Sequence, residues 1–460
     1  MAGERSDRYP PQIPYIVGSE GAERFSFYGM RSILTVYMVQ FLLLEGNEAE
    51  ASYHYFVMAC YLTPLAGGWL ADRYWGRYRV ILWLSLGYVA GHAVMALAES
   101  RGGLALGLAL IALGSGGIKP CVSAYVGDQF APDQGRLLGR VYGLFYWMVN
   151  LGSFAATLLV PELLARFGPR VAFGVPGILM AVALAIFVAG RRRYVDVPPT
   201  GPNPDSFLHV AWSALRRRRE APRGGHWLDA ARGAHPEEAV EGARAVVRIV
   251  AVFAAVTGFW ALFDQHGASW VLQASRMDLR LGAVELRPSQ LSALNPVLVL
   301  ALIPAFQGGL YPWFERRGVR VTALGKIAAG MFLTAGSFLA VAALQALLDA
   351  GGKPHVLWQA VPYLLLTAGE VMVSVTGLEF AYRQAPPKMK STIMSVWFLT
   401  IAAGNLLTAL VSQLNGFRGA WYFSFFAGLM IAAALLFLVA ARTYRPVRAE
   451  AAGGHGTPSS

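Results

Sequence analysis

Long hydrophobic runs separated by short polar segments account for most of the chain. A run of about 20 apolar residues is long enough to cross a bilayer as a helix. Such runs occur on both sides of a polar, arginine-rich interval at 191–247, which contains no segment able to cross a bilayer. The pattern predicts membrane helices near 14–44, 52–70, 79–98, 104–126, 141–161, 171–190, 248–274, 291–310, 322–348, 356–380, 392–414 and 420–441.

Composition agrees with a polytopic membrane protein. Of the 460 residues, 55% are hydrophobic and only 14% are charged, whereas soluble domains carry roughly a quarter charged residues. Residues 1–12 contain no apolar core of a signal peptide, so none is expected. Cys60 and Cys121 both lie in apolar runs, so no disulfide framework is expected.

The net charge of +12 has a simple explanation that involves no nucleic acid. Arginine and lysine collect after the even-numbered predicted helices, for example at Arg73, Arg136, Arg191, Arg316 and Lys388. Membrane proteins concentrate these residues in cytoplasmic loops. We therefore expect a multi-pass protein of the cell (inner) membrane with both termini in the cytoplasm, with the lipid bilayer and not a nucleic acid as its surroundings.

Two sets of six predicted helices flank the polar interval. The sequence therefore predicts an N-terminal six-helix bundle at 1–190, a cytoplasmic basic linker at 191–247, a C-terminal six-helix bundle at 248–442 and a cytoplasmic tail at 443–460. Paired repeats of this kind are typical of transporters that bind solutes near the middle of the membrane.

The first predicted helix carries an unusual number of ionisable residues. Glu20, Glu23, Arg24, Tyr28 and Arg31 recur at steps of three and four, so they share one helix face. Charges at membrane depth need partners or water. The alternatives are an ion-pair cluster that only holds the bundle together and a polar cavity for transport. We favour the cavity, because structural clusters seldom need so many charges.

Two glycine-rich segments carry further signals. Residues 67–79, with Asp72, Arg73, Gly76 and Arg77, resemble the Gly-x-x-x-Asp-Arg-x-x-Gly-Arg loop of the major facilitator superfamily. Residues 114–130 place Lys119 in the fourth apolar run without the spacing of a phosphate-binding loop. A lone cation at that depth requires a carboxylate partner or a carboxylate ligand.

Residues 20–29 resemble the Glu-x-x-Glu-Arg-Phe-x-Tyr-Tyr-Gly signature of the proton-dependent oligopeptide transporter family. Residues 114–130 are similar to its second signature, Gly-x-Gly-Gly-Ile-Lys-Pro ending in Asp-Gln-Phe. Residues 259–265 and 369–380 look closer to the animal peptide transporters. The resemblance implies the major facilitator fold, an all-α membrane protein with about twelve transmembrane helices in two six-helix bundles. It also implies proton-coupled symport of di- and tripeptides by alternating access.

The resemblance assigns roles to particular positions. Proton coupling falls to Glu20, Glu23, Arg24, His54 and Asp264, and Arg31 with Asp264 forms a gating salt bridge. Peptide binding falls to Tyr28, Arg31, Tyr37, Lys119, Tyr146, Asn150, Trp260, Asn295, Tyr363, Glu370 and Trp397, with Glu370 meeting the amino group. Two peptide contacts are added by position, Tyr61 two turns beyond His54 and His266 next to Gln265. Phe27 and His266 depart from the family pattern and leave side-chain preference open.

Physical chemistry supports this assignment independently. A short peptide is a zwitterion, and the candidate cations lie in the first half while Asp264 and Glu370 lie in the second. His54 titrates in the relevant pH range. Three alternatives compete with this function. A symporter of nitrate or another small solute is disfavoured because an anion has no amino group to meet Glu370, and a membrane hydrolase because the sequence has no nucleophile–base or His-Glu-x-x-His pattern. A receptor that binds peptide without transport is the third. We expect no enzyme, metal site or cofactor other than protons, and a functional monomer.

Overall fold

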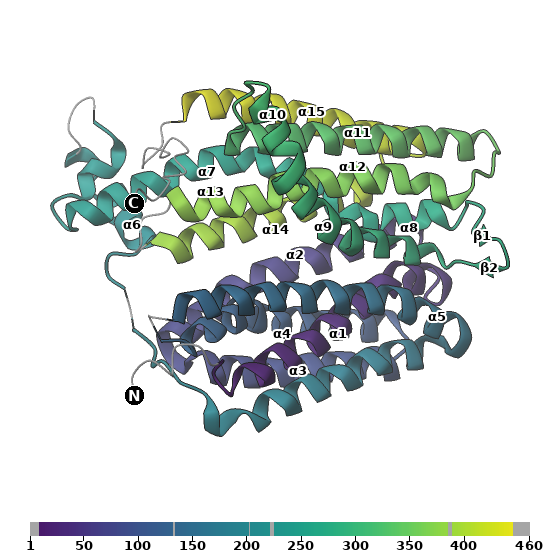
Figure 1. Cartoon of the computed structure of the whole chain (residues 1–460), viewed down its shortest axis with the longest axis horizontal. Helices are drawn as coiled ribbons and strands as arrows, with labels where there is room; N and C mark the ends of the chain where they lie inside the picture. The colour runs from purple at the N-terminus through teal and green to yellow at the C-terminus, as the bar shows by residue number, and fades with distance from the viewer. Residues whose placement is uncertain (1–8, 132–133, 202, 221–224, 385–388, 445–460) are drawn as a thin grey trace, which may run out of the picture.

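The computed structural model describes residues 9–131, 134–201, 203–220, 225–384 and 389–444. The predicted cytoplasmic residue Lys388 and the predicted tail beyond residue 444 lie outside these ranges. The described chain is helical apart from a small antiparallel hairpin, β1 (Arg280–Leu281) and β2 (Val284–Glu285). Figure 1 shows two helical halves lying side by side, the N-terminal half below and the C-terminal half above.

Each half is built from long helices that pack against one another. The N-terminal half contains α1 (Ile13–Gln40), α2 (Gly46–Leu70), α3 (Arg77–Leu97), α4 (Arg101–Asp128) and α5 (Gly135–Ala189). The C-terminal half contains α7 (Glu237–Phe263), α8 (Ser269–Ala274), α9 (Leu294–Ala305), α10 (Tyr311–Arg316), α11 (Ala323–Asp349), α12 (Ala360–Glu370), α13 (Thr376–Gln384), α14 (Lys390–Leu414) and α15 (Ala420–Thr443). A short helix α6 (Phe207–Arg216) lies in the segment between the halves.

The predicted fold class is confirmed. Nine helical stretches in the described residues are long and apolar enough to cross a membrane. One of them, 135–193, contains two passes, because α5 is interrupted at Gly168. Gly168 has a φ of 78°, which is not helical, and the next residue is Pro169. The helices α1 and α2 supply two more passes, although neither is as apolar as the nine stretches. The result is the expected arrangement of about twelve membrane helices.

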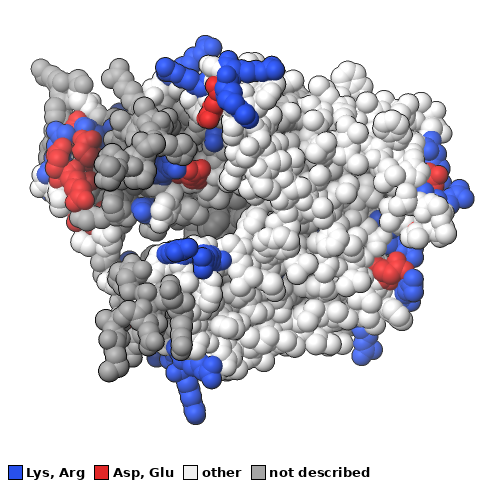
Figure 2. All heavy atoms as spheres, viewed as in Figure 1, with Lys and Arg blue, Asp and Glu red and all other residues white. Residues whose placement is uncertain are grey.

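The two ends of the molecule differ. One end, here called the linker end, carries α6 and the start of α7, and the other, the hairpin end, carries β1 and β2 (Figure 1). Figure 2 shows charged side chains gathered toward both ends and a broad uncharged band between them. Such a band suits the hydrocarbon core of a bilayer.

The seventh membrane helix begins earlier than expected from hydropathy. The apolar run starts near 248, but α7 starts at Glu237. Glu237 and Glu238 occupy its first turn, where acidic side chains favour the helix dipole. Ala239, Val240 and Ala243 are buried in a small apolar cluster with α6. These first turns pack on the linker, so they lack the uniform apolarity of a lipid-facing segment.

Candidate functional site

A chain of polar contacts joins the two halves near the middle of the molecule. Arg31 of α1 forms an ion pair with Asp264, which begins the 3-10 helix η6 (Asp264–Gly267) directly after α7. Arg31 Nε also donates to the hydroxyl of Tyr53 on α2 (2.6 Å). Arg31 is 9% exposed and Asp264 is 2% exposed. The structure therefore brings together the two residues expected to form a gate, in a setting that excludes water.

The same contacts continue to His54. Asn405 of α14 donates to Oδ2 of Asp264 (2.8 Å), and its own Oδ1 accepts from Nδ1 of His54 (2.8 Å). His54 is fully buried, and its Nε2 has no hydrogen-bond partner among the described residues. One side chain, Asn405, therefore couples the histidine of one half to the acid of the other.

The charged face of α1 forms a compact cluster toward the linker end of Arg31. Arg24 Nε donates to Oε1 of Glu20 (2.6 Å) and lies 3.1 Å from Oε2 of Glu23. Both glutamates are 2% exposed. One guanidinium faces two buried carboxylates, so the cluster has one negative charge in excess, which an added proton would neutralise.

Lys119 of α4 forms no ion pair among the described residues, although the charge of Glu23 acts on it from a longer distance. Its Nζ has no hydrogen-bond partner among the described residues. It lies over two aromatic faces, 4.6 Å from the centroid of Phe27 and 4.4 Å from that of Tyr61. Cation–π contacts of this kind stabilise a desolvated ammonium group. Phe27, one of the departures from the family pattern, thus supplies an apolar ring beneath the lysine.

The C-terminal half offers an acid in a comparable state. Glu370, the last residue of α12, accepts a hydrogen bond from Nδ2 of Asn295 (2.7 Å). No ion pair involves Glu370 within the described part of the chain. The helix changes to a π-helical turn directly after it, at 371–375, and such turns are frequent at functional sites. Tyr28 and Tyr146 of the other half lie within electrostatic range of this carboxyl group.

Other predicted contacts are buried within their own half. Tyr37, Tyr363, Trp260 and Trp397 are each at most 5% exposed. Tyr37 packs edge-on against Phe173 at 4.8 Å, so the structure does not bring it to the charged groups. Trp260 and Trp397 pack edge-on inside the C-terminal half, with ring centroids 5.8 Å apart.

Of the remaining predicted residues, His266 and Tyr146 are less buried, whereas Asn150 is 8% exposed. His266 is half-buried and donates from Nδ1 to the carbonyl of Phe263 (2.6 Å), and its own carbonyl accepts from Tyr363 (3.1 Å). Tyr146 is 40% exposed, and its carbonyl accepts from Asn150 (2.9 Å). The hydroxyl and imidazole groups here can read a polar ligand.

Contacts between the halves are concentrated toward one end. Besides the pairs above, Thr35 donates to the carbonyl of Gly267 (2.9 Å) and Arg287 donates to Glu162 (3.0 Å). Among pairs of described residues, the hydrogen bonds and ion pairs that join the halves lie from the middle toward the hairpin end. On the face in Figure 2, the surface is notched at its left edge, between the halves at the linker end. The hairpin end is thus closed.

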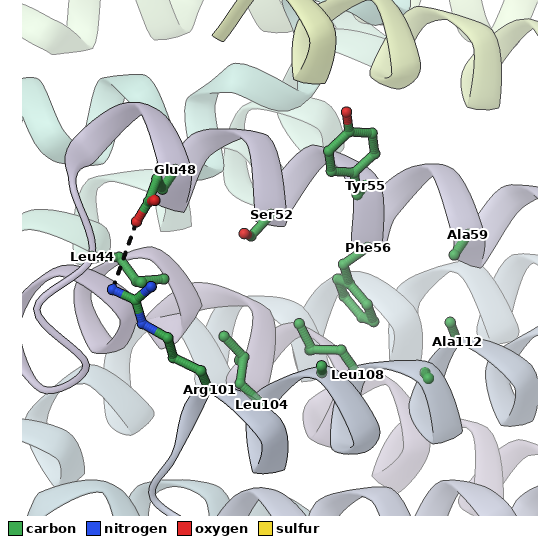
Figure 3. A pocket seen from close by; sticks show the side chains of 12 residues that line it. Leu44, Glu48, Ser52, Tyr55, Phe56, Ala59, Arg101, Leu104, Leu108 and Ala112 are labelled. Atoms are coloured by element: carbon green, nitrogen blue, oxygen red, sulfur yellow. Dashed lines mark ion pairs between the residues drawn. The ribbon is translucent and has the colours of Figure 1, made fainter. Parts of the chain in front are cut away.

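A separate groove of about 440 Å³ lies within the N-terminal half. Figure 3 shows it between α2 and α4, lined mainly by apolar side chains such as Phe56, Leu104 and Leu108. The pair Glu48–Arg101 (3.9 Å) stands at one end of it. None of the predicted site residues lines this groove, so it is distinct from the candidate site.

Sequence reasoning assigned no role to Asn405 or Tyr53, which complete the contacts around Asp264. Asn405 is the one asparagine in the predicted helix at 392–414, and an amide side chain in the middle of a largely apolar run is a usable signal. Among the described residues, no group of three or more His, Cys, Asp or Glu side chains could hold a metal ion.

A sequence model described as the POT family matches residues 78–416. The chain belongs to the POT family. Solute carrier family 15 member 2 from Mus musculus is 37% identical over 391 residues, which are 80% of this chain and 54% of that protein. Peptide transporter 3 from Caenorhabditis elegans is 41% identical over 358 residues, 73% of this chain and 51% of that protein. This POT family chain therefore spans about half the length of these relatives.

Solved structures of the family are similar over nearly the whole chain. The crystal structure of an auto-inhibited POT family peptide transporter has a TM-score of 0.89 and 40% identity, covering 97% of this chain and 99% of that one. The structure of the POT family transporter PepTSo has a TM-score of 0.88 and 43% identity, with coverages of 95% and 99%. The POT family fold is thus shared over nearly the whole chain.

Proposed function

We propose that this POT family protein is a proton-coupled symporter of di- and tripeptides that works by alternating access. It acts without an enzymatic step and without a cofactor other than protons. The family and the names of the relatives, which include peptide transporters, support this proposal. The proposal rests on one observation, which is that Lys119 and Glu370 have opposite charges and no ion-pair partner among the described residues.

Two complementary charges lack ion-pair partners within the described residues. Lys119, in the N-terminal half, rests only on aromatic faces. Glu370, in the C-terminal half, accepts a hydrogen bond from the neutral amide of Asn295. A zwitterionic peptide carries a carboxylate for the first and an ammonium group for the second. It would neutralise both and draw the halves together, which provides the differential binding that alternating access needs.

Proton coupling is supported by the contacts around Asp264. Protonation of Asp264 would weaken its pairing with Arg31 and remove charge from the contact with Asn405. Both effects would loosen the closed hairpin end. His54, linked to Asp264 through Asn405, and the pair Glu20 and Glu23 around Arg24 supply further groups that can hold or release protons.

The proposed orientation places the linker end in the cytoplasm of the cell (inner) membrane, with the termini on that side and the protein acting as a monomer. The arginines of the linker, including Arg191–Arg193, support this orientation through the positive-inside rule. Labelling of single cysteines at exposed linker and hairpin positions in intact cells tests it directly. Preferential labelling of linker positions from outside would reverse the proposed orientation.

The deciding experiment is uptake of labelled dialanine into proteoliposomes with and without an inward proton gradient. Accumulation driven by the gradient, and competed by tripeptide but not by free alanine, is the expected result. Exchange of peptide without driven accumulation would contradict the coupling. Absence of any peptide-dependent signal would contradict the substrate.

The alternative substrate is nitrate or another small anion. Lys119 alone would suit an anion, but an anion has no group to meet Glu370. The same proteoliposomes therefore include nitrate as a competitor, and competition by nitrate in place of tripeptide would favour the alternative.

A further inference from the structure

Helix α2 packs along α14 at the hairpin end and brings a second carboxyl group to the boundary between the halves. Three side chains of α2 form hydrogen bonds with α14, within residues 50–55. His54 contacts Asn405, Tyr55 donates to Gln413 (2.6 Å), and Glu50 accepts from Ser412. Glu50 is the acidic member of this row, and none of the roles described above uses it.

The surroundings of Glu50 are hydroxyl groups. Oε2 of Glu50 lies 3.2 Å from Oγ of Ser412, which in turn lies 3.0 Å from the hydroxyl of Tyr422 on α15. Ser412 is 2% exposed and Tyr422 is 8% exposed. Two residues from different helices of the C-terminal half thus contact one carboxyl group of the N-terminal half, which is itself half-buried.

No cation balances this carboxyl group among the described residues. Tyr422 is the titratable group that faces it from α15, and α14 presents only Ser412 and Gln413 there. Farther along α2, His54 turns to Asn405 and Tyr53 turns to Arg31. The charged side chains nearby are engaged elsewhere, as Arg276 is with Asp349 (3.6 Å) and Arg101 with Glu48.

Partial burial therefore affects the two forms of Glu50 differently. Removing a carboxylate from water without a cation costs far more free energy than removing the neutral acid. The neutral acid can also donate to a hydroxyl oxygen, which the carboxylate cannot. When the hairpin end is closed, the neutral form fits this site. When α2 and α14 separate, the group returns to water and ionises.

We propose that Glu50 is a positioning residue of the hairpin-end gate, whose protonation from the outer solution favours closure of α2 against α14 and α15. The proton enters from the outer solution on closure and returns to it on opening. Glu50 thus changes the pH dependence of the gate but not the number of protons carried per peptide. The orientation used here rests on the proposed function.

The test follows the gate itself, without substrate. Spin labels at Phe167→Cys and Leu357→Cys, two exposed positions at the hairpin end of opposite halves, report its opening in nanodiscs. The distance distribution is measured between pH 5 and pH 8. Because protonation of Asp264 would open the same end at low pH, the contribution of Glu50 is read as a difference between variants: the open population should rise with pH more steeply in the unchanged protein than in Glu50→Gln. In the Glu50→Gln variant, which imitates the neutral acid, most of that rise should be lost.

Glu48→Gln is the matched control. Glu48 lies on the same helix two residues away, but it points to Arg101 across the groove of Figure 3 and not to α14. This variant should keep the full pH response. A second variant, Glu50→Asp, retains a carboxyl group and should keep a pH-dependent gate even where Glu50→Gln folds poorly.

Two results would overturn the proposal: an undiminished pH response in Glu50→Gln, or an equal loss in Glu48→Gln. The ratio of protons to peptide, measured by reversal potential, should be the same in Glu50→Gln as in the unchanged protein. A lower ratio would instead make Glu50 a carrier of a transported proton and contradict the positioning role. Because the distance measurement needs no peptide, failure of the proposed substrate leaves it interpretable.

Discussion

At the scale of single residues, the site is defined by which charges are paired and which are not. Arg31 and Asp264 satisfy each other across the boundary between the halves. Arg24 is shared by two glutamates. Lys119 and Glu370 have no ion-pair partner among the described residues. The pair of Arg31 and Asp264 joins the halves and so stabilises the closed state, whereas Lys119 and Glu370 are the charges that we propose a ligand meets.

The role of Glu370 can be tested by removing its charge. We expect Glu370→Gln to weaken binding of dialanine by about 10-fold or more, since a hydrogen bond to a charged group contributes roughly 1.5–3 kcal/mol. The measurement is the dissociation constant of purified protein by calorimetry. Glu379→Gln is the control, because Glu379 is exposed on α13 and pairs with Arg383 at 2.6 Å. Equal affinities in the two variants would exclude a role for Glu370 in recognising the amino group.

At the scale of elements, small residues set how closely the helices approach. A Cβ atom at Gly67 of α2 would lie 2.6 Å from the carbonyl oxygen of Gly116 and 2.8 Å from Cα of Gly117, both on α4. Neither backbone atom can move aside without moving its helix. At the neighbouring Gly68, the nearest atom is Cβ of Pro120 at 3.8 Å, an ordinary contact.

This difference gives a matched pair of substitutions. Gly67→Ala should destabilise the N-terminal half by about 1–3 kcal/mol, the usual cost of overpacking, while Gly68→Ala should change stability little. Thermal unfolding of the two variants in the same detergent provides the comparison. A lower unfolding temperature for Gly68→Ala than for Gly67→Ala would contradict the helix packing described above.

The linker forms a small folded element outside the membrane. The imidazole Nδ1 of His226 accepts a hydrogen bond from the backbone N–H of Leu228 (3.3 Å) at the start of η5 (Trp227–Ala231). Partial burial, followed by the charge of Arg244, holds the pKa of His226 below its ordinary value. The folded linker therefore favours the neutral ring, which alone can accept this bond.

The sign of the pH dependence follows. His226 binds a proton more readily in the unfolded segment than in the folded linker. The stabilisation that the neutral ring gives the folded linker is therefore present above about pH 6.5 and is lost as the pH falls below it. Hydrogen exchange of the linker amides, corrected for intrinsic rates, should show weaker protection at pH 5 than at pH 7.5. His226→Asn keeps an acceptor and should reduce that difference. A linker that is better protected at pH 5 would reverse the assigned sign.

At the scale of the whole molecule, the two halves meet through a limited set of polar contacts between described residues, from the middle toward the hairpin end. Arg287 and Glu162 form the outlying member of this set, with side chains 35% and 29% exposed. An ion pair that exposed contributes at most about 1 kcal/mol. Because the pair joins the two halves, its free energy contributes directly to the balance between open and closed states.

Charge reversal tests this contribution. Glu162→Lys or Arg287→Glu alone should increase the open population of the hairpin end by up to about fivefold, corresponding to roughly 1 kcal/mol. The double reversal should restore much of the closed population. Distances between the labels at positions 167 and 357 provide the readout, and the effect should shrink at high salt. Singles and double that behave alike would show that the pair does not stabilise closure.

The sequence by itself determined the elements and their chemistry. Runs of apolar residues define the membrane helices, because a bilayer demands length and apolarity and little else. The motifs at 20–29 and 114–130 identified the family to which the chain belongs. The resemblance, which also covers residues 259–265, named both partners of the Arg31–Asp264 pair, although 233 positions separate them.

Only the tertiary structure decided which polar groups meet. Asn405 between His54 and Asp264, and Ser412 and Tyr422 around Glu50, are brought together from helices far apart in the chain. Periodicity shows which side of a helix is polar, but not which neighbour faces it or at what height. Those depend on how two long helices cross and slide, which is set by the packing of the whole bundle. For the same reason Tyr37, a candidate by motif, is buried against Phe173.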